Sequence, residues 1–426
     1  MPSDSSSVRT QETLALHGGE PAGVDRPETL AHGPAEIGDE EIAAVTEVLR
    51  SRNLFRFGRP PEESPTARFE KLFGEMTEVP HVLAVNSGTS ALICAMVGLG
   101  VSTGDEVIIP AYTYIATPAA VLSRGAVPVI AEIDESLTMD PADVEAKITP
   151  RTRAIVPVHM RGTPCRMQEL LDVARRHNLQ VLEDVAQANG GAYRGRPLGS
   201  FGDAAGFSLQ QFKIITAGEG GAFVAREREV YERGACFHDS AYTFWLEHHK
   251  QLHIDAFLGE NYRMSELNGA LALVQLRKRD RILQRTRAAK RRIMEQVGDL
   301  ENIGFQDVPD PDGDCGIGLV MLAESDDRAR RISEALSAEN ITAGTVLSGV
   351  MPDRHIFCYW DYIIDKRTPD RTGYPWNHSD LAYDREMCPK TLDVLGRTIS
   401  LPLSQTMSDA HVDSIARSIR KVLAQV

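Results

Sequence analysis

The sequence is poor in cysteine, has no excess of positive charge and contains no long apolar run. No two cysteines form a CxxC pair and no histidines cluster at metal-ligand spacing, so we expect free thiols in a reducing compartment and no metal. No apolar run approaches the ~20 residues that a membrane-spanning helix needs. The six cysteines are Cys94, Cys165, Cys236, Cys315, Cys358 and Cys388.

Positive charge is outnumbered by negative charge. The chain has 46 Lys and Arg against 60 Asp and Glu, a formal net charge of −14. Nucleic acids and anionic membranes attract cationic surfaces, so we expect neither of them as a partner. The Ser-rich stretch 1–10 has no apolar core of the kind found in a secretory signal, which predicts a frayed tail on a cytoplasmic protein.

Apolar residues make up 42% of the chain and charged residues 25%, which is typical of a globular protein with a sizeable core. From about residue 38 onwards, helical patterns alternate with short apolar runs. Buried strands separated by helices favour a mainly parallel sheet that is covered on both faces. Helices are expected at 38–51, 66–76, 87–100 and 167–178, and strands at 81–85, 106–110, 126–133, 154–159 and 181–185.

The pattern loosens after about residue 225 and predicts a smaller second domain. The stretch 258–283 opens a long helix, and a strand at 316–324, a helix at 328–341 and an amphipathic helix at 408–426 follow it. We therefore expect an N-terminal tail or arm at 1–34, a large domain at 35–283 and a small C-terminal domain at 284–426.

The segment 351–388 is unusually aromatic and charged. One interpretation is an insertion that faces the substrate, with Arg354, His355 and Trp360 as candidate residues. The other is a surface loop packed on the small domain.

Two stretches that follow predicted strands could contact a ligand. In NSGTSAL (86–92) the backbone amides of Gly88, Thr89 and Ser90 begin a helix, which suits a phosphate but also an ordinary helix cap. In AYTYIATPA (111–119) Tyr114 could support a flat ring or simply pack in the core.

The stretch VLEDVAQANGG (181–191) ends a buried strand with two carboxylates. Glu183 and Asp184 point to opposite faces of that strand, so at most one of them faces a given pocket. A buried carboxylate needs a partner; a protonated pyridine nitrogen and a structural arginine would both serve.

Lys213 lies in FSLQQFKIITAGEGGAF (207–223), just beyond another predicted strand. It is either a solvated surface cation or an amine with a lowered pKa that forms a Schiff base with an aldehyde cofactor. The glycines of GEGG (218–221) predict a tight turn with a close approach of the backbone.

Six motifs in order resemble those of the DegT/StrS-type (DegT/DnrJ/StrS) aminotransferases, pyridoxal-phosphate enzymes that aminate keto sugars, cyclitols and related ketones. The resemblance covers roughly residues 35 to 425. It implies an α/β fold of the fold-type I, aspartate aminotransferase-like class, with a mainly parallel large domain and a smaller α+β C-terminal domain. The motifs are GDEVIIPAYTYIAT (104–117), VPVHMRGTP (156–164), LEDVAQANGG (182–191), FSLQQFKIITAGEGGAF (207–223), GENYRMSELNGAL (259–271) and SLPLSQTMSD (400–409).

The resemblance also implies a role for each candidate residue. Lys213 would hold pyridoxal phosphate as a Schiff base and shuttle a proton between the substrate carbon and the cofactor. Asp184 would pair with the pyridine nitrogen and keep it protonated, while Gln187 would approach the 3-oxygen of the ring. Tyr114 would stack over the pyridine ring.

The phosphate of the cofactor would be bound by backbone amides and a hydroxyl, contributed by Gly88, Thr89, Ser90 and Ser208. Asn261 resembles the residue that reaches this phosphate from a neighbouring subunit, so the active site would require a homodimer.

The implied activity is a two-step transamination from L-glutamate or L-glutamine to a keto sugar, a keto cyclitol or another natural-product ketone or aldehyde, as in antibiotic biosynthesis. The alternative is a pyridoxal-phosphate-dependent dehydratase or aromatising synthase of the aminobenzoate-forming type. A regulatory protein that keeps only the fold is a third class, which the intact set of Asp184, Gln187, Ser208 and Lys213 disfavours.

Overall fold

The structure is a computed structural model that describes residues 12–24, 29–241, 252–347 and 352–426 of the 426-residue chain. The tail expected at 1–10 therefore lies outside the described residues, and so does part of the expected arm.

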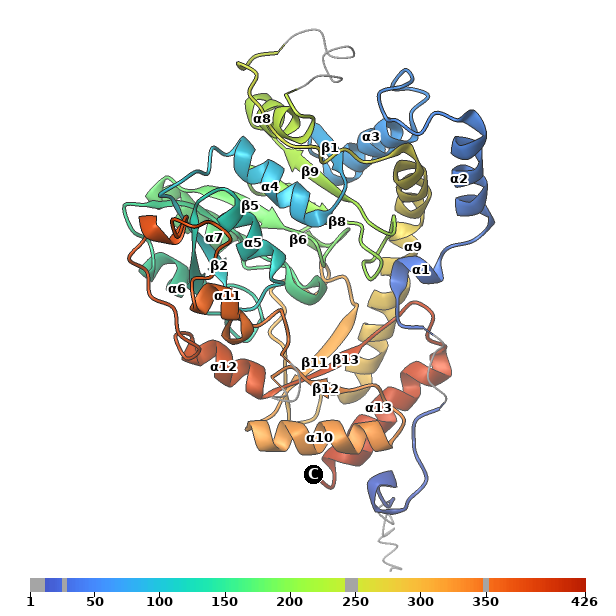
Figure 1. The fold of residues 1–426 in the computed structure, drawn as a ribbon. Helices are drawn as coiled ribbons and strands as arrows, with labels where there is room; N and C mark the ends of the chain where they lie inside the picture. The colour runs from blue at the N-terminus through green and yellow to red at the C-terminus, as the bar shows by residue number, and fades with distance from the viewer. Residues whose placement is uncertain (1–11, 25–28, 242–251, 348–351) are drawn as a thin grey trace, which may run out of the picture.

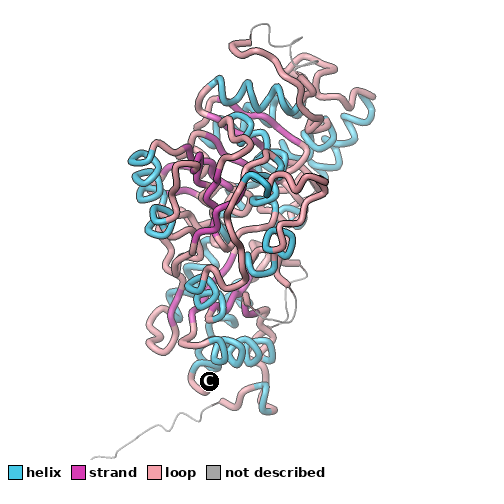
Figure 2. Tube along the Cα trace, turned by 60° about the vertical axis from the view of Figure 1, so that its left-hand side comes forward, coloured by secondary structure: helices cyan, strands magenta, loops and turns pink. Residues whose placement is uncertain are grey.

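A seven-stranded sheet forms the centre of the larger part of the molecule, in the order β1-β9-β8-β5-β4-β2-β3. Only β9 runs antiparallel to its neighbours, so the predicted mainly parallel sheet is confirmed. Figure 2 shows its strands in magenta between helices on either side. The strands are His81–Val85 (β1), Glu106–Pro110 (β2), Val127–Ala131 (β3), Thr152–Ile155 (β4), Gln180–Asp184 (β5), Ala204–Ser208 (β8) and Gly221–Ala225 (β9).

Helices cover both faces of this sheet because its strands are apolar on both sides; all five residues of β2 are buried. One core lies under α4, α5 and α8, and a second lies under α3, α7 and the first half of α9. The four helices expected in this region are confirmed to within a few residues. The helices are Asp39–Ser51 (α2), Pro65–Thr77 (α3), Gly88–Gly98 (α4), Ala116–Ser123 (α5), Pro141–Ala146 (α6), Met167–His177 (α7), Arg228–His238 (α8) and Glu266–Val297 (α9).

A four-stranded antiparallel sheet, in the order β10-β11-β13-β12, forms the smaller part. Two amphipathic helices, Asp326–Ala338 (α10) and Asp409–Leu423 (α13), pack with it around a third core. The strands are Gly304–Phe305 (β10), Gly318–Leu322 (β11), Gly344–Thr345 (β12) and Thr398–Pro402 (β13).

Helix α9 connects the two parts without a break. Its 32 residues span about 48 Å; Leu276 and Leu283 pack in the second core, whereas Ile293 and Val297 pack in the third. The expected division at residue 283 thus falls inside one continuous helix, and the division into two domains stays a prediction.

The chain from residue 352 to 396 returns from the small sheet to the large one. Phe357, Trp360 and Trp376 belong to the core under α4 and α5, and the backbone N–H and hydroxyl of Thr391 donate to the carboxylate of Glu132, next to β3. In Figure 1 α11 is drawn near α5, whereas α12 lies lower, toward the small sheet. The segment is therefore built mainly onto the large sheet, which argues against the interpretation as a surface loop packed on the small domain. Its elements are Phe357–Tyr359 (η4), Asp361–Ile364 (α11), Trp376–His378 (η5) and Pro389–Gly396 (α12).

Shorter elements complete the described chain: Ala15–His17 (η1), His32–Ala35 (α1), Met160–Gly162 (η2) and the hairpin Ala192–Tyr193 (β6) with Arg196–Pro197 (β7). All six cysteines are free and buried, which confirms the expected free thiols. Among the described helices, none combines the length and apolar character that crossing a membrane requires.

Trp360 is expected to anchor the 352–396 segment. Its side chain is 0% exposed and its Nε1–H donates to the carbonyl of Arg354 at 3.0 Å. Trp360→Ala should lower the free energy of unfolding by about 3–5 kcal/mol, because it leaves a large cavity; urea denaturation measures this loss. The matched change Tyr362→Ala, at a side chain that is 40% exposed, should cost less than about 1 kcal/mol. Equal losses would contradict the anchoring role.

Candidate active site

The carboxyl ends of the parallel strands open into one cavity of about 1080 Å3. In parallel sheets, residues that follow different strands meet at this edge, which is where ligands bind in open α/β folds. The cavity collects seven of the nine residues that the sequence singled out as site residues. These are Gly88, Thr89, Tyr114, Asp184, Gln187, Ser208 and Lys213.

Asp184 is the last residue of β5 and is 4% exposed. Its Oδ2 accepts a hydrogen bond from the hydroxyl of Thr117 at 2.8 Å, and its Oδ1 accepts the N–H of Ala186 at 3.1 Å. Burial raises the pKa of this carboxyl above its usual value, although these hydrogen bonds and the charge of Lys213 oppose the rise. The carboxylate thus lies in a place where one more cation would be strongly favourable.

Glu183 faces the other side of β5, as the alternation of the strand predicts. It is fully buried and accepts the backbone N–H groups of Gly199, Phe201 and Gly202, each at 2.8 Å. His159 lies 3.1 Å from it, and because the Nδ1 of His159 accepts the N–H of Cys165, its Nε2–H donates to Glu183. Glu183 is therefore fully satisfied by protein groups and supports the strand beneath Asp184.

Lys213 lies in the turn between β8 and β9 and lines the cavity. Burial lowers the pKa of its amine below the ordinary value, and the carboxylate of Asp184 offsets part of this effect. The carbonyl of Lys213 accepts the N–H of Gly33, so the N-terminal arm packs on the turn. An amine with a lowered pKa has a larger neutral, nucleophilic fraction near pH 7, which favours the chemical interpretation over the solvated surface cation.

The glycines around Lys213 allow the backbone segments to approach closely. A Cβ on Gly88 would lie 2.7 Å from the Cβ of Ser208, and one on Gly221 would lie 2.5 Å from the carbonyl oxygen of Ser87. Gly218 has a positive φ of 77°, which permits the turn that the sequence predicts. The start of α4 and the end of β8 therefore form one narrow cradle of N–H groups and hydroxyls.

Ser90 lies outside this cradle. Its N–H donates to the N-cap residue Ser87, and its hydroxyl donates to Asn86 at 2.6 Å. The backbone amide of Ser90 is thus used for capping, and its contact with a phosphate stays a prediction. Ser87 itself lines the cavity, although the sequence analysis passed over it.

Gln187 and Tyr114, the two remaining residues expected to contact the ring, both line the cavity. Gln187 lines the cavity, and its Oε1 accepts the N–H of Arg161 at 3.1 Å, which orients the side-chain amide. Tyr114 follows β2, is 48% exposed and lines the cavity. Its ring centroid lies 5.1 Å from that of His355.

Asn261 does not line the cavity of its own chain. It is exposed, forms an isolated antiparallel bridge with Asp239, and its side-chain oxygen accepts the N–H of Arg263 at 3.3 Å. This position is compatible with a role of Asn261 in a neighbouring subunit, which stays a prediction.

Several cavity residues were missed by the sequence analysis. Thr117 could have been recognised from the sequence as a site residue, because it lies in the same motif as Tyr114. Thr29 and His32 come from the N-terminal arm, and Gln210 and Glu219 come from the turns around Lys213. No local pattern marks the residues of the arm, since only the packing of α1 against the 213 turn brings them to the cavity.

The donor set fits the cofactor that the resemblance implies. Pyridoxal phosphate is a flat, phosphorylated aldehyde with a ring nitrogen that carries a proton. The cavity offers it an amine with a lowered pKa, a buried carboxylate with a raised pKa, an aromatic ring and a cradle of N–H groups. Lys213, Asp184, Tyr114 and Ser208 are the residues that would hold it.

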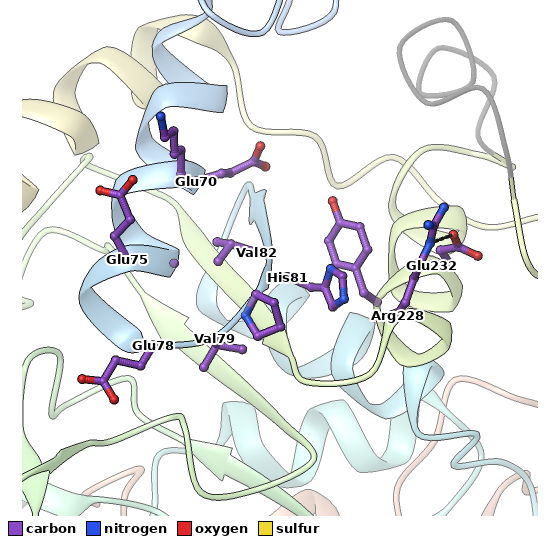
Figure 3. A pocket seen from close by; sticks show the side chains of 12 residues that line it. Glu70, Glu75, Glu78, Val79, His81, Val82, Arg228 and Glu232 are labelled. Atoms are coloured by element: carbon purple, nitrogen blue, oxygen red, sulfur yellow. Dashed lines mark hydrogen bonds and ion pairs between the residues drawn. The ribbon is translucent and has the colours of Figure 1, made fainter.

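A second hollow of about 790 Å3 lies between α3, β1 and α8 (Figure 3) and contains none of the predicted site residues. Glu75 and Glu78 line one side, but Glu70 pairs with Arg56 at 2.6 Å and Glu232 pairs with Arg228 at 2.7 Å. The described part of the chain has no group of three potential metal ligands. We therefore assign no ligand to this hollow.

Comparison with known proteins gives a family match. The model of the DegT/DnrJ/EryC1/StrS aminotransferase family matches residues 35–351. Among solved structures, DesV of S. venezuelae has a TM-score of 0.73 and 30% sequence identity, and the alignment covers 91% of this chain and 95% of that one. The expected fold class is thereby confirmed.

Two curated relatives are sugar and cyclitol enzymes by name. GDP-perosamine synthase of Caulobacter vibrioides is 42% identical over 231 residues, which are 53% of this chain and 59% of the relative. L-glutamine:2-deoxy-scyllo-inosose aminotransferase of Streptomyces kanamyceticus is 36% identical over 253 residues, which are 57% of this chain and 58% of the relative. The chain thus spans less than two thirds of the length of both relatives.

The lowered pKa of Lys213 should be measurable in protein freed of cofactor. Reductive methylation consumes neutral amines, so Lys213 should react at a lower pH than lysines with the usual pKa of 10.5. Mass spectrometry of peptides over a pH series measures this, with exposed Lys71 as the internal reference. In Asp184→Asn protein the pKa of Lys213 should fall further, since the carboxylate no longer favours the charged amine. A Lys213 profile that coincides with that of Lys71 would contradict the lowered pKa.

Proposed function

The chain belongs to the DegT/DnrJ/EryC1/StrS aminotransferase family, and on that premise we propose a pyridoxal-phosphate-dependent transamination as its activity. An amino group would move from L-glutamate or L-glutamine to a keto sugar, a keto cyclitol or a related natural-product ketone or aldehyde. The observation that carries this proposal is the meeting of Lys213 and Asp184 in one cavity, with shifts of their pKa values that suit the roles of base and ring partner.

When bound, pyridoxal phosphate acts as an electron sink for the carbon–hydrogen bond that breaks during amino transfer. Asp184 keeps a proton on the ring nitrogen, because the buried carboxylate is stabilised by the resulting positive charge. Thr117 holds the carboxylate in position through the 2.8 Å hydrogen bond to Oδ2. Glu183 and His159 brace β5 from the opposite face.

Lys213 moves the proton. In its neutral form the Nζ atom would take the proton from the substrate carbon and hold it until it is transferred again, which is general acid–base catalysis. Burial lowers the pKa of the amine and so enlarges the neutral fraction that can act as a base. Tyr114 and the residues of the arm, including His32, line the cavity around the ring and limit the access of water to it.

We also propose a homodimer in which Asn261 completes the active site of the partner. Its exposed position outside its own cavity supports this, because a phosphate contact from Asn261 would then have to come from a second copy. A cytoplasmic location and a place in antibiotic biosynthesis stay predictions of the sequence.

The names of the relatives support a hydroxylated ring as the acceptor. One relative makes a sugar nucleotide, GDP-perosamine, and the other aminates a cyclitol ketone with L-glutamine. Both names describe amination on a ring that carries hydroxyl groups, so we propose acceptors of this class for the present protein.

The donor half-reaction tests the activity directly. Purified protein with pyridoxal phosphate should show a visible absorbance band that is lost on addition of L-glutamate or L-glutamine. Lys213→Ala should slow this change at least about 100-fold, since the proton loses its acceptor, while Lys71→Ala should react like the wild type. Circular dichroism establishes that the Lys213 variant is folded.

Two outcomes would contradict the proposal. A protein that binds no pyridoxal phosphate, or that reacts with neither amino acid, is not this transaminase. Release of an aromatic amine from a ring substrate without an external donor would favour the aminobenzoate-forming alternative.

The role of Asn261 in the dimer can be tested by complementation. The Lys213→Ala and Asn261→Ala proteins should each have low transaminase activity. Mixing and reassociating their subunits should restore about a quarter of the wild-type activity, because half of the dimers contain one subunit of each kind and each such dimer has one intact site of two. If Asn261 acted within its own subunit, every site in a mixed dimer would carry one defect. Steady-state rates after reassociation at equal concentrations distinguish the two results.

A further inference from the structure

The segment that returns from the small sheet carries a side chain into the cavity. Residues 354–357 lie antiparallel along 111–115, with an isolated bridge between Tyr112 and Ile356. The N–H of Thr113 donates to the carbonyl of His355 at 2.8 Å, and further backbone hydrogen bonds of 3.0 and 3.1 Å flank it. The backbone of His355 is thus held at the carboxyl end of β2, beside the residues that line the cavity.

The neighbours of His355 in this segment have structural roles. Ile356, Phe357 and Trp360 are all 0% exposed, so they anchor the strand-like pairing in the core. Arg354 is exposed, and its guanidinium carbon lies 5.5 Å from the ring centre of Tyr362. Of the three candidates that the sequence analysis named, only His355 lines the cavity.

The ring of His355 is oriented by Asp353. Its Nδ1 lies 2.7 Å from Oδ1 of Asp353, and that same oxygen accepts the backbone N–H of His355 at 3.0 Å. Burial raises the pKa of Asp353, but the hydrogen bonds and charge of His355 outweigh it and hold the pKa below its usual value. Asp353 is therefore an anion that accepts the Nδ1–H, and within the described residues Nε2 has no hydrogen-bond partner.

We propose that His355 is a specificity-determining residue that binds a ring hydroxyl of the amino acceptor through Nε2. The inference rests on the proposed transaminase function and deepens it. With Nδ1–H directed to Asp353, Nε2 is the ring nitrogen left for a ligand, and a hydroxyl, which both donates and accepts hydrogen bonds, can pair with it. The anionic Asp353 beside it disfavours a carboxylate or phosphate at this point, so the carboxylates of the amino donor bind elsewhere.

His355 also lies close to the position expected for the cofactor ring. Its ring is 5.1 Å from that of Tyr114, the residue expected to stack over the cofactor ring. A hydroxyl near the carbonyl carbon of a keto sugar or keto cyclitol would reach this position, whereas an unsubstituted ketone has no group to offer. His355 thus distinguishes acceptors whose ring carries a hydroxyl from acceptors without one. The backbone of 354–357, fixed by its hydrogen bonds, gives His355 the rigidity that this discrimination requires.

Measuring the donor and acceptor half-reactions separately distinguishes a role of His355 in binding the acceptor from a role in the reaction as a whole. The probes are L-glutamine for the donor step, and 2-deoxy-scyllo-inosose and hydroxyl-free cyclohexanone for the acceptor step, each followed by absorbance. In His355→Ala the step with 2-deoxy-scyllo-inosose should slow roughly 10–100-fold, the loss of one hydrogen bond in a desolvated site. The steps with L-glutamine and cyclohexanone should change less than about twofold.

Three further measurements sharpen the assignment. His355→Gln keeps a side-chain acceptor and should recover part of the lost rate. His378→Ala removes an exposed histidine of the same segment and should react like the wild type with every probe. In protein labelled with 15N-histidine, myo-inositol, which has hydroxyls but no carbonyl, should shift the Nε2 resonance that His355→Gln removes; this readout needs no turnover.

The outcomes that overturn the inference differ from those that overturn the function. If His355→Ala slowed the acceptor step equally with 2-deoxy-scyllo-inosose and with cyclohexanone, the role of His355 would be structural. If it slowed neither step, His355 would make no contact with the acceptor. A wild-type protein that completes the donor step but reacts no faster with the inosose than with cyclohexanone would also overturn it. Failure of the donor step itself would instead refute the proposed transaminase.

Discussion

The buried carboxylate of Asp184 at the end of β5 is the constraint on which the rest of the site depends. A carboxylate that is 4% exposed and has a raised pKa is tolerated only where the protein or a ligand supplies compensation. Thr117, the N–H of Ala186 and the charge of Lys213 supply part of it. The same burial lowers the pKa of Lys213, so the desolvation that makes Asp184 costly also prepares the amine for its chemistry.

The pKa shifts of Asp184 and Lys213 both depend on the exclusion of water from the cavity. Two segments that are remote in sequence cover the cavity. The N-terminal arm packs through Gly33 on the carbonyl of Lys213, and the 352–396 segment pairs with the chain after β2. Both line the cavity, through His32 and His355 respectively. The residues proposed to carry out the chemistry thus come from the large sheet, whereas the groups proposed to close the cavity and select its ligand come from the N-terminal arm and the 352–396 segment.

Much of the chemical site followed from the sequence because it is encoded locally. An apolar strand followed by a polar motif places that motif at the carboxyl edge of a parallel sheet, so Asp184, Tyr114 and Lys213 were placed correctly. Family order of the motifs then implied their roles. Ser90 shows the limit of local reasoning, since its amide suits a phosphate in the sequence but is used by the N-cap Ser87.

The sequence by itself determined the sheet and the helices that cover it, because hydrophobic periodicity acts over a few residues, and the resemblance of its motifs to a family implied the type of chemistry. The tertiary structure decided which residues close the cavity and which of Arg354, His355 and Trp360 faces it. Neighbouring residues in one irregular segment carry no periodicity that assigns them to core, solvent or ligand. Only the backbone pairing of 354–357 with 111–115, and the burial of Trp360 that fixes it, directs His355 into the cavity and leaves Arg354 exposed.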